Sequence, residues 1–74
     1  YRIYPCRDGR VALAALEPHF ARQLCQVAHI EWTGFEVMRD SATRQRIGIF
    51  VSTLTCQELD ALSIRHDIPL HTLK

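Results

Sequence analysis

Two short apolar segments lie near the start of the chain, one on each side of an Asp-Gly pair. Residues 2–6 and 10–16 read as strands, and they flank Arg7-Asp8-Gly9. This pattern predicts a β-hairpin, because Asp and Gly both tolerate the positive φ of a tight turn. Pro5 has no N–H to donate, so we expect the first strand to lie at a sheet edge. The second strand is apolar on both faces, which predicts that something covers each of them.

The apolar spacing after this hairpin becomes helical. Pro18 suits the first position of a helix, which should end near His29. Residues 31–36 read as a loop in which Trp32 and Phe35 cap the edge of the core. The buried stripe predicted for this helix consists of Phe20, Leu24, Val27 and Ala28.

Two further helices are predicted in the second half of the chain. The first begins after an N-cap at Asp40 or Ser41 and reaches Leu54. The second begins at Thr55, because Thr55 and Glu58 have the spacing of a capping box. Their inward-facing residues are expected to be Ile47, Phe50, Val51 and Leu54 in the first, and Leu59, Leu62 and Ile64 in the second.

A third strand is expected at residues 70–73, which alternate in polarity after Pro69 stops any helix. The element order is therefore β-β-α-α-α-β. This order predicts an α+β fold, with three helices on one face of a small three-stranded sheet formed by the hairpin and the C-terminal strand. No repeat or linker interrupts the chain, so residues 1–74 are expected to form a single small domain.

Charge and length restrict the possible functions. The chain has 74 residues and a net charge of +1, which gives no electrostatic case for nucleic acid or an anionic membrane. Its longest apolar run, residues 11–16, is too short to span a bilayer. The chain starts at Tyr1 with strand-like sequence, and we interpret it as an excised piece of a larger protein.

The three cysteines, Cys6, Cys25 and Cys56, are odd in number and widely spaced. Reduced thiols in a cytoplasmic protein are the simplest interpretation. No Cys-x-x-Cys motif occurs, and the four histidines do not fall at zinc-ligand spacing with the cysteines. The sequence therefore predicts no metal site.

One residue is a candidate for chemistry on its position alone. Glu17 lies where the second strand ends and Pro18 opens a helix, and strand ends are places where sites are often built. The alternative is that Glu17 only interacts with the helix dipole. No nucleophile elbow, phosphate loop or zinc-protease motif is present, so the chain is not expected to be an enzyme by itself. A helix-turn-helix with the hairpin as a wing, or a protein-interaction module, remains open as a different class of function.

The first twenty residues resemble a known family. Tyr-x-Cys-x-Asp-Gly-Arg at residues 4–10 and Leu16-Glu17-Pro18-His19-Phe20 are similar to the start of the small domain of the family III CoA-transferases, which include α-methylacyl-CoA racemase. The segments Ala42-Thr43-Arg44 and Glu58-Leu59, together with residues 66–70, are similar to the later helices and final strand of that domain.

The resemblance implies a larger acyl-CoA-processing enzyme, with a Rossmann-like, CoA-binding large domain on the N-terminal side and two chains interlocked as a homodimer. It implies a catalytic role for Glu17, whose carboxylate supports a His of the large domain. That His exchanges the α-proton of a 2-methylacyl-CoA. Tyr1 and Leu16 become candidates for lining the acyl pocket, with core packing as the alternative. No metal or organic cofactor is implied, because coenzyme A is part of the substrate. CoA transfer between carboxylic acids is the alternative activity.

Overall fold

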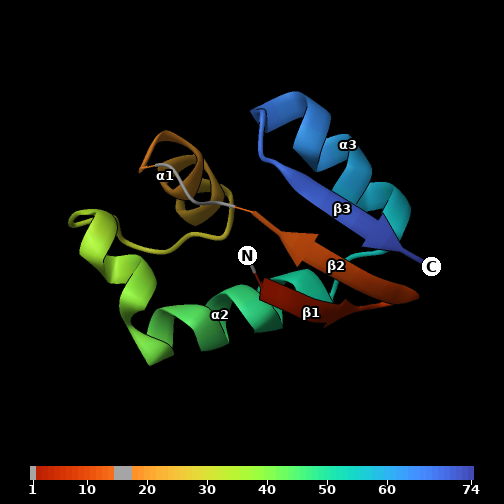
Figure 1. Cartoon of the computed structure of the whole chain (residues 1–74), viewed down its shortest axis with the longest axis horizontal. Coiled ribbons are helices and arrows are strands. Elements are labelled where there is room, and N and C mark those ends of the chain that lie inside the picture. The colour runs from red at the N-terminus through yellow and green to blue at the C-terminus, as the bar shows by residue number, and fades with distance from the viewer. Residues whose placement is uncertain (1, 15–17) are drawn as a thin grey trace.

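The computed structural model describes residues 2–14 and 18–74 and has the element order that the sequence predicts (Figure 1). The α+β prediction is therefore confirmed. A short 3₁₀ helix, η1, forms where the sequence predicted the end of a loop. The elements are β1 (Arg2–Cys6), β2 (Gly9–Leu13), α1 (Pro18–Val27), η1 (Phe35–Arg39), α2 (Ser41–Ser52), α3 (Cys56–His66) and β3 (Leu70–Leu73).

The sheet has β2 at its centre. Its order is β1-β2-β3, and both pairings are antiparallel. Tyr4 is opposite Val11, and Val11 is opposite Thr72, so these three side chains share one face. Pro5 lies on β1 at the edge, as predicted, where its missing N–H costs no ladder hydrogen bond.

The hairpin turn differs from the prediction. Cys6 pairs with Gly9, so the turn consists of Arg7 and Asp8, and Gly9 belongs to β2. Neither Asp8 nor Gly9 has a positive φ. Glycine is required at position 9 for space, because an added Cβ would collide with the carbonyl oxygen of Leu73.

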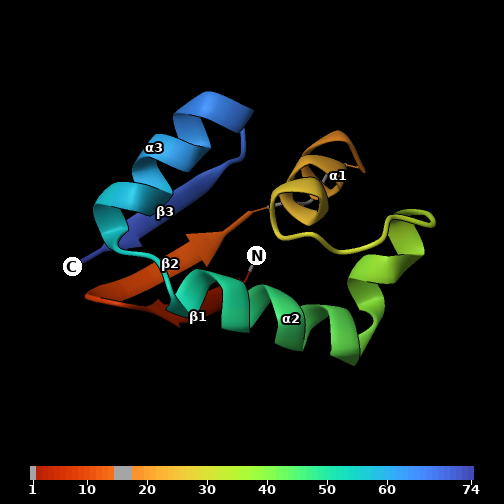
Figure 2. The same ribbon diagram turned by 180° about the vertical axis from the view of Figure 1, so that it is seen from behind.

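Two helices cover the same face of the sheet (Figures 1 and 2). Gly48 of α2 packs against the ring of Tyr4, and Thr72 donates a hydrogen bond to Asp60 of α3 over 2.8 Å. Because Tyr4 and Thr72 flank Val11 in the sheet, Val11 is enclosed between both helices and is fully buried. Among the described residues nothing covers the opposite face, where Ile3 and Leu73 are 59% and 49% exposed.

The core joins all three helices to β2. Its fully enclosed aliphatic side chains each contribute roughly 1.5–3 kcal/mol by leaving water. The predicted inward residues of α2 and α3 are mostly right, but in α1 the stripe is centred on Ala21, Leu24 and Cys25, and Phe20 is only half-buried. The buried core cluster is Val11, Leu13, Leu24, Cys25, Ile30, Ile47, Val51, Leu59 and Ile68.

The ends of α3 are well defined. The Thr55 hydroxyl accepts a hydrogen bond from the Glu58 N–H, and the Glu58 carboxylate accepts one from the Thr55 N–H, which confirms the predicted capping box. Asp67 ends the helix in the left-handed conformation, with φ of 54°. The prediction that Ile64 faces inward is wrong, because Ile64 is 86% exposed. Five residues after Leu59, it has rotated about 140° around the helix away from the core.

Two further properties of the helices are their apolar length and the angle between α2 and α3. In the described residues no single helix is long and apolar enough to cross a membrane. Helices α2 and α3, which are bent by 117° relative to each other, have the length and composition of a membrane span only when they are taken together. Their apolar residues Ile47, Val51 and Leu59 are buried in the core. The same angle falls within the range of helix-turn-helix motifs, but α3 packs along β3 and has no basic face.

Candidate functional site

The three residues that the sequence singled out lie outside the described residues. Glu17, Leu16 and Tyr1 belong to positions 1 and 15–17. The structure therefore leaves their roles as predictions. It does describe the elements on both sides of Glu17 in the chain, which are the end of β2 and the start of α1. We call the surroundings of these two ends the β2–α1 junction, defined by Ala14, Pro18, His19, Asp67 and Pro69.

A backbone hydrogen bond fixes one side of the β2–α1 junction. The N–H of Ala14 donates to the carbonyl oxygen of Pro69 over 3.0 Å. This bond extends the pairing between β2 and β3 by one residue beyond the strand ends. Ile68, which precedes Pro69, is 1% exposed and belongs to the core. The end of β2 is therefore anchored beside a residue of the buried core.

The other side of the junction carries an imidazole and a carboxylate. Nε2 of His19 lies 4.0 Å from Oδ2 of Asp67, and the two side chains are 61% and 86% exposed. Exposed pairs of this kind contribute little to stability. The His19 ring also packs on Phe20, with ring centroids 4.8 Å apart. Both groups are therefore open to solvent beside the start of α1.

A second group of side chains that can carry chemistry comes together only in the folded chain, and the sequence did not predict it. The fold brings Cys6, Asp8 and Cys56 together, with their ligand atoms all within 4.8 Å of one another. The two Sγ atoms are 3.6 Å apart, and Oδ1 of Asp8 accepts a hydrogen bond from the Cys56 N–H over 2.7 Å. We call these three residues the thiol–carboxylate cluster. Cys6 and Cys56 are 50 positions apart, so no local spacing could have revealed it.

The surroundings of this cluster raise the pKa of Cys56 and lower the pKa of Asp8. Burial, hydrogen bonds to Cys6 and Asp8, and the nearby negative charge raise the pKa of Cys56 to about 11. The backbone hydrogen bond from Cys56 lowers the pKa of Asp8 below its ordinary value, and the ammonium of Lys74, 3.7 Å away, adds to this effect. At neutral pH the cluster therefore holds an ionised carboxylate beside a protonated Cys56 thiol.

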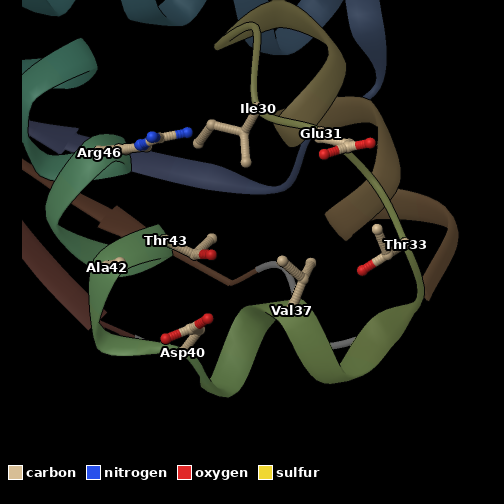
Figure 3. Close-up of a pocket in the computed structure, with 8 residues that line it drawn as sticks. All are labelled: Ile30, Glu31, Thr33, Val37, Asp40, Ala42, Thr43 and Arg46. Carbon is tan, nitrogen blue, oxygen red and sulfur yellow. The ribbon is translucent and has the colours of Figure 1, made fainter.

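A hollow of about 280 Å³ lies between the loop after α1, η1 and the start of α2 (Figure 3). Figure 3 shows the Val37 and Thr43 side chains directed into it and Arg46 extending toward Ile30. Its volume is just below the range of ordinary small-molecule sites. It is too small for an acyl-CoA thioester, and we do not assign the substrate to it.

Comparison with known families gives one match. The model of CoA-transferase family III, a family of CoA-processing enzymes, matches residues 1–74. The chain matches none of the curated proteins and none of the solved structures. The family match spans the hairpin, the β2–α1 junction, the helices and the last strand, and it confirms the resemblance seen in the first twenty residues. The chain therefore belongs to CoA-transferase family III.

Proposed function

We propose that the chain is the small domain of a cytoplasmic acyl-CoA-processing enzyme, and that this enzyme is an α-methylacyl-CoA racemase. The observation that carries the proposal is the family match over residues 1–74, together with the sequence pair Glu17-Pro18, of which Pro18 is the first residue of α1. The odd number and wide spacing of Cys6, Cys25 and Cys56 in the sequence support the cytoplasmic part of the proposal.

The proposed reaction is a 1,1-proton transfer at the carbon beside the thioester. A His of a Rossmann-like large domain removes the α-proton as one catalytic base, and an Asp of that domain delivers a proton to the opposite face. Glu17 acts as a positioning residue, because its carboxylate orients the imidazole and stabilises the imidazolium that forms. Tyr1 and Leu16 line the acyl pocket in this proposal.

Two features of the described residues support a larger assembly. Ile3 and Leu73 expose apolar surface on the uncovered face of the sheet, where a large domain or the second chain of a homodimer could pack. The second feature is the hydrogen bond from the Ala14 N–H to the Pro69 carbonyl, which fixes the described end of β2 against β3.

CoA transfer between carboxylic acids is the second candidate, because the matching family is described as CoA-transferases. Such a transfer uses a carboxylate nucleophile in the large domain and requires no exchange at the α-carbon. The two reactions therefore differ in whether solvent hydrogen enters the substrate.

The experiment uses the full-length protein and a 2-methylacyl-CoA in D2O, with mass spectrometry of the recovered thioester. We expect one deuterium at the α-carbon. A folded enzyme that leaves the α-carbon unlabelled but moves CoA to an added carboxylate contradicts the racemase and supports the transferase.

The role of Glu17 has its own test. In Glu17→Gln we expect turnover to fall about 100-fold, the lower end of what a positioned acid–base group contributes. The pH–rate profile should also shift to lower pH, because loss of the carboxylate lowers the pKa of its His partner. Glu31→Gln removes an exposed carboxylate elsewhere and should leave both measurements unchanged. An unshifted profile in Glu17→Gln means that Glu17 only interacts with the helix dipole.

A further inference from the structure

The thiol–carboxylate cluster joins two parts of the chain that are distant in sequence. Cys6 ends β1, Asp8 belongs to the hairpin turn, and Cys56 is the first residue of α3. The segment that leads into α3 runs beside the hairpin turn (Figure 2), where the Arg7 N–H also donates to the Leu54 carbonyl over 2.8 Å. This backbone hydrogen bond ties the hairpin turn to the segment before α3 and so keeps the three residues near one another.

The chemistry of these donors matches a particular class of cation. Two thiols and a carboxylate supply two sulfur ligands and one oxygen ligand, and thiolates favour zinc-like ions over magnesium or calcium. Cys56 is buried, Cys6 is half-buried and Asp8 is exposed, so an ion can enter from the side of the carboxylate.

The distances also fit a tetrahedral centre. Two sulfurs bound to zinc at about 2.3 Å lie about 3.8 Å apart when the geometry is tetrahedral. The Sγ atoms of Cys6 and Cys56 are 3.6 Å apart without any movement. The carboxylate oxygen lies within 4.8 Å of both, so reaching a tetrahedral sulfur–oxygen edge of about 3.5 Å requires it to move inward by at most about 1.3 Å.

We propose that Cys6, Cys56 and Asp8 form a binding site for a thiophilic divalent cation of the zinc type, with its fourth position open to water. Binding releases the thiol protons, and the metal links the β-hairpin to the first turn of α3. The inference does not depend on the reaction of the parent enzyme, and its test needs no substrate.

Lys74 is the group that opposes a cation at this site. Its Nζ lies 3.7 Å from Oδ2 of Asp8, and its side chain is 79% exposed. The ammonium can move into solvent, but its charge repels the metal while it stays. Removal of this charge in Lys74→Ala should therefore tighten metal binding, most clearly at low ionic strength.

The test is a titration of the 74-residue chain with Co2+, in the presence of a phosphine that keeps the thiols reduced. Competition with Zn2+ and with Mg2+ follows. We expect one equivalent of Co2+ to produce thiolate-to-metal charge-transfer absorption and the strong visible bands of tetrahedral cobalt. Zn2+ should remove these bands and Mg2+ should not. A spectrum that remains that of the octahedral aqua ion overturns the proposal.

Variants separate the proposed site from other thiols. Cys6→Ser with Cys56→Ser retains Cys25 and should lose the charge-transfer absorption, whereas Cys25→Ala should retain it. Asp8→Asn keeps an oxygen that can accept the Cys56 N–H and provides a variant expected to fold, as circular dichroism can verify. Asp8→Asn should bind the metal at least about tenfold more weakly, because even mutations of residues that only hydrogen-bond to metal ligands lower metal affinity by that factor. Equal affinity in Asp8→Asn, or an unchanged spectrum in the double variant, contradicts the assignment.

Discussion

Leu59 and Ile64 make the packing of α3 directly testable. Both are large aliphatic residues of the same helix, but Leu59 is 1% exposed and Ile64 is 86% exposed. Replacing each with alanine therefore removes similar side chains from opposite environments. The difference between the two variants reports the effect of burial, because alanine has a high helix propensity at both positions.

The expected magnitudes differ widely. Leu59→Ala should lower the free energy of unfolding by about 2–5 kcal/mol, the range for a leucine lost from a packed core. A chain of this size has a total stability of roughly 4–11 kcal/mol, so the loss is a large share of it. At about 4–8 °C per kcal/mol, Tm should fall by at least about 8 °C. Ile64→Ala should change the free energy of unfolding by no more than about 0.5 kcal/mol.

Urea unfolding of both variants, followed by far-UV circular dichroism, measures the difference. Similar midpoints for the two variants would refute the assignment of Leu59 to the core and Ile64 to the surface. A large loss in Ile64→Ala alone would show that α3 is rotated from the position described here.

Two further predictions concern the first turn of α3. Thr55→Ala should lower the free energy of unfolding by about 1 kcal/mol, because the Glu58 N–H loses its acceptor, whereas Thr55→Ser should stay close to the parent in the same urea titration. The folded-state pKa of Asp8 is lowered from 3.8, so its charge stabilises the fold above that pH, and this contribution is lost as pH falls through the lower folded-state value. The urea midpoint of the parent should therefore exceed that of Asp8→Asn near neutral pH, and the two should converge in strong acid; a constant difference would exclude the linkage.

Local signals predicted most of the elements correctly. The capping box at Thr55 and Glu58 fixes the start of α3 within one residue, because both hydrogen bonds form between neighbours in the chain. Pro18 marks the first residue of α1, because the backbone N–H that proline lacks would have no partner within the helix at that position. Of the two N-caps that the sequence offers for α2, Asp40 and Ser41, the structure uses Asp40, although its side chain makes no capping hydrogen bond.

Tertiary contacts account for what the sequence could not predict. The Asp-Gly pair predicts a turn position for Gly9, but the close approach of β3 determines its role. The thiol–carboxylate cluster depends on Cys56 meeting Cys6 across 50 positions, which no spacing rule covers. The candidate residue Glu17 lies outside the described residues, so its geometry remains a prediction.

The structure also divides the family-like stretch into parts with different roles. Asp8 holds the first turn of α3 through the Cys56 N–H, and Gly9 admits the backbone of β3, so both have structural duties that would exist in an inactive domain. Their presence therefore says nothing about whether the parent enzyme racemises or transfers. In the function proposed above, that distinction rests on Glu17, which follows Ala14 by three positions in the sequence. A Glu17→Gln variant that keeps its fold but loses α-deuteration would separate the chemistry of this stretch from its architecture.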